Sequence, residues 1–377
     1  MPSPENGRTT WERLSQPPNP AIKGLAGQDI SKMLALKGTS PSRRQPLAGF
    51  DPDYVDIIDY IVRCTHKIWE ERNVGLLYSH YASNVVVHTP DSEIVGRDKI
   101  ITETIKMQAA FPDLRIYAED VIWSGDDKTG FHTSHRATWV ARNTGYSRYG
   151  APTGRRVVYR EIAHCIVKEN RITEEWTSRD ELAMVWQMGL DAFDLARRVA
   201  AREVEDGFRP PILLGTGEVE RLLGQTTPEQ VPPPPQEGFD VEYFVRRAIH
   251  EIWNWRMFGK IRDYYLPNFQ SYNSSNRILY GWGDLEVFVT QMLAAFPDGR
   301  MLPDQVLVNS DEPGVYRVAV RWYFQGTHQG PGLYGEPTGK PVQIMGTTHY
   351  EIQNEKFVRE WYVFDEFSLL KQIYGPA

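Results

Sequence analysis

The sequence predicts an α+β protein built from two tandem copies of one domain, each with N-terminal helices packed on a curved antiparallel sheet. Three observations predict it: a long internal repeat, an amphipathic helix at the start of each copy, and strand-like segments after it. Met107-Gln-Ala-Ala-Phe-Pro-Asp113 returns 185 residues later as Met292-Leu-Ala-Ala-Phe-Pro-Asp298, and Tyr-Gly-x-Pro-Thr-Gly occurs at 149–154 and 334–339 with the same spacing. A repeat of this size indicates a duplicated domain and not a short solenoid unit.

The helices and strands follow from the apolar pattern. Apolar residues recur at helical spacing between Tyr54 and Trp69, and again between Phe244 and Trp253. A second helix is expected at about 97–110 and 283–295, ended in each copy by Pro and Asp. The strand-like segments of the first copy are 115–124, 131–142, 156–167 and 171–179.

These elements divide the chain into four parts. Residues 1–50, rich in Pro, Ser, Gly and Arg, are expected to form an N-terminal arm. The first domain covers 51–190 and the second covers 239–377. Between them, 191–238 holds an expected helix at 193–204 and a linker with four consecutive prolines, which favour a stiff spacer.

Composition and charge exclude several classes of partner. The net charge of -7 argues against nucleic acid, because phosphate binding needs a concentrated basic surface. Cys64 and Cys165 are too few for a disulfide framework or a cysteine-built metal site, and we expect buried thiols. No apolar run is long enough to span a membrane, and the N-terminus lacks the apolar stretch of a signal peptide. We therefore expect a cytoplasmic protein without a membrane partner.

The motif order resembles that of the SnoaL-like polyketide cyclases, in the NTF2-like superfamily. The order is helix, Phe-Pro-Asp, Gly-x-Pro-Thr-Gly-[Arg/Lys], then a hairpin closing on Trp-x-x-x-Asp, over about 51–190 and 239–377. The second copy is closer, because Gly326-Thr-His-Gln-Gly330 is similar to the family's middle hairpin, whereas the first copy has Ala141-Arg-Asn-Thr-Gly145.

The resemblance implies a cone-shaped α+β barrel whose wide mouth holds an apolar ligand. It also implies domains that dimerise through their sheets, so that the fused pair forms an intramolecular pseudo-dimer, with further homo-oligomerisation left open. The family includes cofactor-free cyclases, isomerases and epoxide hydrolases, as well as members without chemistry. In the cyclases the Asp of Trp-x-x-x-Asp is the acid/base residue, a role that carries over to Asp180 and Asp365. Fold alone does not decide function.

Strand alternation gives a separate prediction of the site. If Glu169-Asn170 is a two-residue turn, then Trp176, Ser178 and Asp180 oppose Ala163, Glu161 and Tyr159 on one face. Two carboxylates in one apolar pocket would have pKa values pushed apart, and a tyrosine can donate to an enolate oxygen. The predicted catalytic residues are Asp180, Glu161 and Tyr159. An ion pair of Glu161 with Arg136 or Arg160 is the structural alternative.

In the second copy the turn is Asn354-Glu355, which places Asp365 and Trp361 opposite Ile344 and Thr348, in apolar surroundings. The same register puts His164 opposite Glu175, and His349 opposite Glu360, on the other face, where we interpret them as sheet-surface or interface pairs. The predicted ligand-binding residues are Trp176, Ser178, His88, His135, Arg136, Asp365, Trp361, Tyr272, Arg321 and His328.

Several of these candidates have structural alternatives. Arg136 and Arg321 either clamp a substrate carboxylate or form salt bridges with sheet acids. His88 is either a second base or a packed histidine, and His328 lies near a hairpin tip and faces either the pocket or the other copy. His132 and His135 lie three residues apart on one strand, so their rings point to opposite faces and do not share a metal.

The leading hypothesis is a cofactor-independent acid/base enzyme, a cyclase, isomerase or lyase, acting on a small or medium-sized carbonyl compound in the first domain's pocket. The ligand is expected to be partly apolar, and no metal is expected. The rivals are a non-catalytic module that binds a small ligand or a partner, and an epoxide or lactone hydrolase. The hypothesis predicts that Asp180→Asn abolishes turnover and that Asp365→Asn reduces it far less.

Overall fold

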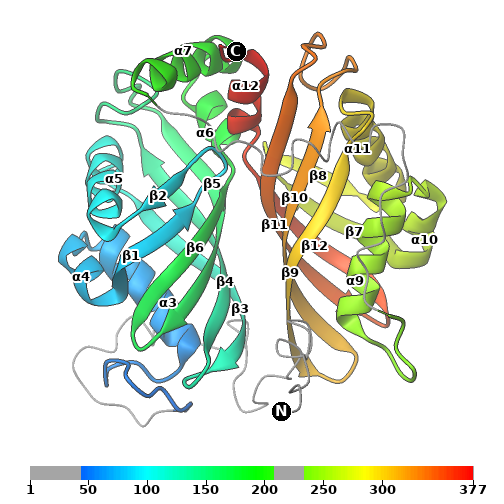
Figure 1. The fold of residues 1–377 in the computed structure, drawn as a ribbon, viewed down its shortest axis with the longest axis horizontal. Helices are drawn as coiled ribbons and strands as arrows, with labels where there is room; N and C mark the ends of the chain where they lie inside the picture. Colours follow the sequence, from blue (N-terminus) through cyan, green and yellow to red (C-terminus); the bar gives the residue numbers. More distant parts are fainter. Residues whose placement is uncertain (1–43, 208–232, 377) are drawn as a thin grey trace, which may run out of the picture.

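The computed structural model describes residues 44–207 and 233–376. The expected N-terminal arm lies almost wholly outside the described residues, as does most of the segment before the prolines. Both copies show the predicted order, with helices first and a sheet after them. In Figure 1 the two sheets lie side by side, with the early helices of each domain on the outer sides.

The elements of the two domains correspond in order. The first domain contains α3 (Ile57–Thr65), η2 (His66–Glu70), η3 (Val74–Leu76), α4 (Leu77–His80), β1 (Tyr81–His88), β2 (Glu93–Val95), α5 (Arg97–Ala110), β3 (Arg115–Asp126), β4 (Gly130–Arg142), β5 (Arg156–Lys168), β6 (Arg171–Arg179) and α6 (Glu181–Gln187). The second contains α9 (Val241–Ile249), η4 (His250–Asn254), η5 (Phe258–Lys260), α10 (Ile261–Tyr264), β7 (Tyr265–Asn273), β8 (Arg277–Tyr280), α11 (Gly281–Ala295), β9 (Arg300–Glu312), β10 (Val315–Thr327), β11 (Pro341–Gln353), β12 (Lys356–Phe364) and α12 (Glu366–Tyr374). Between them, α7 (Ala192–Glu205) occupies the place of the helix expected at 193–204. The domain boundaries at 190 and 239 stay a prediction.

Each domain has one six-stranded sheet. The strand orders are β2-β1-β6-β5-β4-β3 and β8-β7-β12-β11-β10-β9. In the first sheet β1 and β6 run parallel and the other neighbours run antiparallel. The α+β class and the two tandem domains are confirmed, but the expected barrel is not closed: β2, of three residues, and β3 are free edges, so each sheet stays open.

The first helix of each domain is positioned by its cap and its apolar face. The Asp56 carboxylate accepts a hydrogen bond from the backbone N–H of Asp59, and Asp240 does the same for Tyr243. Ile57, Ile58 and Ile61 of α3 are buried. Within the described residues, no helix has both the length and the apolar character needed to cross a membrane.

The last hairpin of each domain departs from the predicted register. The turn Glu169-Asn170 forms as expected, and Lys168 and Val167 pair with Arg171 and Ile172. A bulge then leaves Thr173 without an opposite residue, so Ile166 pairs with Glu174 and every later pair is shifted by one. Between Ile352 and Glu351 the hairpin of β11 and β12 has the same shift, which leaves Val358 unpaired.

The shift overturns the predicted cross-strand pairs. Glu161 opposes Arg179 and not Ser178, whereas His164 opposes Trp176 and not Glu175. In the second domain His349 opposes Trp361 and not Glu360. Because successive side chains point to opposite faces, a shift of one residue moves Trp176 and Ser178 away from the face of Glu161.

The two domains pack through the sheet faces that point away from their helices. The Ser178 and Thr347 hydroxyls lie 3.1 Å apart across the interface, and Ser134 Oγ lies 2.8 Å from Nε2 of His349. The Asn309 side chain also bonds to the backbone of Trp123 in the other domain. At one end of the interface α7 of the linker packs along α12 (Figure 1).

Candidate functional site

The first domain contains a cavity of about 860 Å³ between the inner face of its sheet and the helices α3 and α5. Exposed lining residues, among them Glu103, Tyr146 and Arg148, mark where it reaches the surface. The sheet forms one wall of the cavity. The lining residues from the sheet are Tyr159, Glu161, Ala163 and Cys165 of β5, Glu175, Thr177 and Arg179 of β6, and His135, Ala137 and Trp139 of β4. This volume and a mostly apolar lining suit a small or medium-sized organic ligand.

Glu161 forms an ion pair with Arg179. The Arg179 Nε donates to Oε2 of Glu161 at 2.6 Å across the paired strands. The expected alternative partners, Arg136 and Arg160, both bond to Glu119. Within the described residues the two terminal amino groups of Arg179 make no hydrogen bond, so they remain available to a ligand.

Glu175 faces the same cavity in different surroundings. Its carboxylate accepts a hydrogen bond from the Tyr81 hydroxyl at 2.9 Å, and the side chain is buried. Burial raises the pKa of Glu175 to about 7, and the nearby charge of Glu161 acts in the same direction. Both protonation states are therefore populated near neutral pH.

His135 presents an unpartnered polar atom to the cavity. The residue is 5% exposed, and its Nε2 has no hydrogen-bond partner within the described part of the chain. Burial lowers the pKa of His135 to about 4, so the ring is neutral at pH 7. A buried nitrogen of this kind needs a ligand or a water as partner. His132 points to the opposite face, as predicted, and lies 2.9 Å from Nε2 of Gln305 in the second domain.

Tyr159 lies in the cavity wall beside Trp139, with their rings stacked at 6.0 Å. Burial raises the pKa of Tyr159, so the phenol keeps its proton and can donate it in a hydrogen bond. Two of the three predicted catalytic residues, Glu161 and Tyr159, thus face one cavity.

Asp180 lies elsewhere. It follows the last residue of β6 and caps α6, where its carboxylate accepts from the backbone N–H of Ala183 at 3.3 Å and of Ser275 at 2.8 Å. Burial raises the pKa of Asp180 to about 7. Among the described residues that line the cavity, Asp180 is absent, so its predicted catalytic role has no support from its position.

Most of the predicted ligand-binding residues lie in the domain interface. The Arg136 guanidinium lies 3.5 Å from the ring centroid of Trp361, and Arg321 lies 3.6 Å from that of Trp176. These arginines also pair with Glu119 and Asp304, as the salt-bridge alternative expects.

The other predicted side chains have partners of their own. His88 stacks on Trp176 and lies 2.9 Å from Glu174, and Tyr272 stacks on Trp361. His328 lies 3.2 Å from the Thr338 hydroxyl and packs on Phe296 in its own domain. Asp365 differs from these residues and resembles His135, because both line the cavity of the first domain.

The second domain fills the equivalent space with aromatic rings. Trp322, Tyr362 and Phe364 stand at the positions of Ala137, Thr177 and Arg179. The ring centroids of Trp322 and Tyr362 are 4.9 Å apart, and those of Trp322 and Phe364 are 6.1 Å apart. The counterpart of Glu161 is Gly346, where an added Cβ would lie 2.2 Å from the Trp322 ring. Glycine is therefore what lets this ring lie flat against the sheet.

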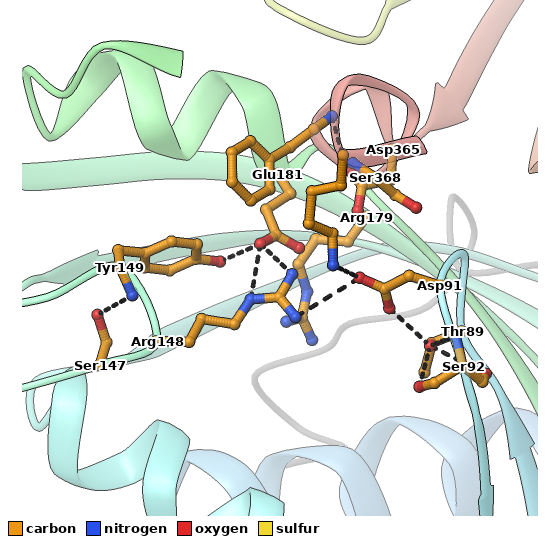
Figure 2. A network of polar contacts seen from close by, with 12 residues as sticks. Thr89, Asp91, Ser92, Ser147, Arg148, Tyr149, Arg179, Glu181, Asp365 and Ser368 are labelled. Carbon is orange, nitrogen blue, oxygen red and sulfur yellow. Dashed lines mark hydrogen bonds and ion pairs between the residues drawn. The ribbon is translucent and has the colours of Figure 1, made fainter. Parts of the chain in front are cut away.

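A polar network joins the rim of the cavity to the second domain (Figure 2). The Arg148 Nε donates to Glu181 at 3.0 Å, and the Tyr149 hydroxyl donates to the same oxygen at 2.5 Å. Lys371 of α12 reaches across to Asp91 in the β1–β2 turn and to Glu203 of α7. The cavity rim thus contains charged groups from both domains.

Comparison with known proteins places the chain in a family. The model of the SnoaL-like polyketide cyclases matches residues 60–188 and 244–373. The chain belongs to the SnoaL-like polyketide cyclase family. No curated protein matches its sequence.

Several solved structures are similar to about one third of the chain each. IdmH from Streptomyces antibioticus, described as a candidate polyketide cyclase, is 22% identical; the match covers 35% of this chain and 97% of that protein, with a TM-score of 0.31. A protein from Jannaschia sp. CCS1, described as a candidate SnoaL-like polyketide cyclase, is 19% identical, with 38% of this chain and 100% of that protein covered and a TM-score of 0.32. AclR from Streptomyces galilaeus, described as a candidate hydroxylase, is 18% identical, with 36% and 83% covered and a TM-score of 0.31.

Sequence reasoning missed Glu175 and Arg179 because it assumed an unbroken register. A signal was available in the second copy. There Tyr350, Tyr362 and Phe364 stand at the positions of Cys165, Thr177 and Arg179, and large aromatic residues at alternate positions are typical of a strand face that points into a core. Read in this way, the pattern assigns Glu175, Thr177 and Arg179 to the inner face.

Proposed function

We propose that the first domain binds a medium-sized, partly apolar carbonyl compound and transfers protons next to its carbonyl group without a cofactor. The reaction class is that of a cyclase, isomerase or lyase. The main observation in support of this proposal is that Glu161 and Glu175 line the same cavity but have different surroundings. Glu161 is paired with Arg179, whereas Glu175 accepts a hydrogen bond from the Tyr81 hydroxyl and has a pKa of about 7. A pKa near the working pH suits a general base.

The roles follow from these positions. Glu175 accepts the proton from the carbon next to the carbonyl, and the terminal amino groups of Arg179 and the Tyr159 hydroxyl donate to the enolate oxygen. In a ring closure, the enolate carbon attacks a second carbonyl of the same ligand, a C–C bond forms, and the protonated Glu175 returns its proton to the new alkoxide. The second domain serves in this proposal as a built-in pseudo-dimer partner.

Solvent deuterium exchange tests this assignment. The full chain is incubated in D₂O with 2-tetralone, a bicyclic ketone with acidic α-protons, and label uptake is followed by mass spectrometry. We expect Glu175→Gln to slow exchange by a factor on the order of 10²–10⁴.

The matched control is Glu360→Gln in the second domain. Glu360 is equally buried, lies 3.4 Å from the Tyr265 hydroxyl, and has a pKa raised to about 7 by burial, but aromatic rings occupy the space beside it. We expect this variant to exchange at the wild-type rate. Unchanged exchange in Glu175→Gln, or equal loss in both variants, would contradict the proposal.

One observation favours a non-catalytic binding module instead. The Tyr81–Glu175 hydrogen bond recurs as Tyr265–Glu360 in the second domain, so the pair supports the fold even where aromatic rings pack beside it. In that case 2-tetralone would bind to the first domain and leave with all its protons. The exchange experiment therefore separates the two functions.

A further inference from the structure

The aspartates of the two Trp-x-x-x-Asp motifs are equivalent in sequence but not in their surroundings. Both cap a helix: Asp180 caps α6, and Asp365 caps α12. The carboxylate of Asp180 also accepts from the backbone of Ser275, in the β7–β8 turn of the other domain. Asp365 accepts from Phe367 and Ser368 of its own helix, and the residue lines the cavity of the first domain.

One carboxylate oxygen of Asp365 takes no part in capping α12. Both of its helix-capping hydrogen bonds end on Oδ1, and within the described residues Oδ2 makes none. In the first domain the equivalent turn is the β1–β2 turn, where the Asp91 side chain pairs with Lys371. An oxygen without a partner at a cavity wall is available to a ligand.

The charges around Asp365 favour its neutral form. Burial raises the pKa of Asp365 well above its usual range, and the negative charges of Glu181 and Asp91 raise it further, against the opposing effect of Arg148. Lys371 pairs with Asp91 and Glu203 nearby. A neutral carboxyl group that accepts at Oδ1 carries its proton on Oδ2 and therefore acts as a donor there.

We propose that Asp365 of the second domain donates a hydrogen bond to an oxygen atom of the ligand bound in the first domain. The inference rests on the proposed function only in taking this cavity as the ligand site, and it requires no proton transfer to carbon. It also specifies the ligand class. The group near Asp365 is a hydrogen-bond acceptor such as a ketone oxygen, because a neutral carboxyl group donates from Oδ2.

The position of α12 supports this contact. Lys371 of α12 is 5% exposed, lies about one helical turn beyond Ser368, and bonds to Asp91 in the first domain and to Glu203 of α7. These bonds hold the start of α12 against the cavity rim. The ligand site is therefore completed by the second domain.

Binding of two probes to the full chain tests the proposal. The probes are 2-tetralone and tetralin, which share one skeleton but differ in the ketone oxygen, and affinity is measured by equilibrium dialysis. Asp365→Ser keeps a helix-capping oxygen and removes the group that faces the cavity. We expect it to weaken 2-tetralone binding about tenfold, as the loss of one hydrogen bond to a neutral acceptor would, and to leave tetralin binding within about twofold.

Two further variants complete the design. Asp365→Asn keeps a donor on the same side chain, so we expect it to recover most of the affinity for 2-tetralone. Asp180→Ser, the matched change at the other cap, should alter binding of neither probe. Unchanged 2-tetralone binding in Asp365→Ser, an equal loss for both probes, or a wild-type chain that binds neither probe would overturn the proposal. If only the proposed reaction is wrong, the wild-type chain would not exchange deuterium into 2-tetralone, but Asp365→Ser would still bind 2-tetralone more weakly than wild type.

Discussion

Arg179 donates a hydrogen bond from Nε to Oε2 of Glu161 at 2.6 Å, across two neighbouring strands in the wall of the first domain's cavity. The counterparts in the second domain are Phe364 and Gly346, so the ion pair belongs to one copy alone. The pair exists because the bulge at Thr173 shifts the register of β6. A local backbone irregularity therefore decides which side chains meet in the cavity.

The Arg179–Glu161 ion pair should contribute to the free energy of unfolding. Arg179→Met leaves the Glu161 carboxylate without its partner, and we expect a loss of about 1 kcal/mol in the free energy of unfolding, since the arginine side chain is 31% exposed and solvent screens the pair. Urea denaturation of Arg179→Met, Glu161→Gln and the double variant measures the coupling. Strictly additive effects would show that the two side chains do not interact.

Transplanting the second domain's packing should close the cavity. Ala137→Trp alone places an indole against Glu161, as Trp322 lies against Gly346. We expect this single variant to destabilise the domain by about 1–3 kcal/mol through overpacking. The pair Ala137→Trp with Glu161→Gly reproduces the second domain's arrangement, so it should recover stability yet lose 2-tetralone binding. Retained binding in the pair would show that the ligand site lies elsewhere.

The buried carboxyls should make stability fall as pH rises. Burial raises the pKa of Glu360 to about 7, whereas the unfolded chain ionises near its usual value. Between about pH 4 and pH 7 the unfolded state releases this proton and the folded state keeps it, so the folded state loses stability up to pH 7 and no further above it. Glu360→Gln removes this dependence and should gain up to about 3 kcal/mol at pH 8 but little at pH 4. Thermal unfolding at both pH values checks it, and an equal gain at both would be inconsistent with titration.

The proposed reaction should itself depend on pH. Glu175 must be ionised to accept a proton, and burial raises its pKa to about 7. Exchange of deuterium into 2-tetralone, measured as kcat/KM, should therefore rise about tenfold per pH unit below pH 7 and level off above it. A rate that is flat from pH 5 to pH 9 would exclude Glu175 as the base.

The interface tryptophans should affect stability and not ligand binding. Trp176 and Trp361 each carry an arginine of the other domain over their rings. Trp176→Leu and Trp361→Leu should each lower the free energy of unfolding by about 2 kcal/mol, from lost packing and the lost cation–π contact. Their affinities for 2-tetralone should stay within about twofold of wild type. A selective loss of affinity in Trp176→Leu would restore its predicted place in the ligand site.

The geometry also reverses one expectation from the sequence. The motif alone predicted that Asp180→Asn abolishes turnover and that Asp365→Asn has a small effect. Asp180 is satisfied by backbone donors of α6 and of the β7–β8 turn, whereas Asp365 faces the cavity. We now expect Asp365→Ser to be the more damaging of the two cap variants for ligand binding.

The sequence by itself determined the duplication, the α+β class, the family and most element positions. Each of these depends on local pattern: apolar periodicity over α3 and α5, turn residues at Glu169-Asn170, and motifs repeated at one spacing. Strand alternation also predicted that Glu161 and Tyr159 share a face, and both line the same cavity.

Only the tertiary structure decided which residues of β6 line the cavity together with Glu161 and Tyr159. One unpaired residue, Thr173, inverts the parity of every residue after it, and the sequence of the first copy alone does not show where this bulge lies. The placing of Asp365 against the first domain's cavity depends on how two sheets pack, which brings together residues far apart in the chain. Local patterns specify strands and helices, whereas register and domain packing depend on long-range contacts that no single segment encodes.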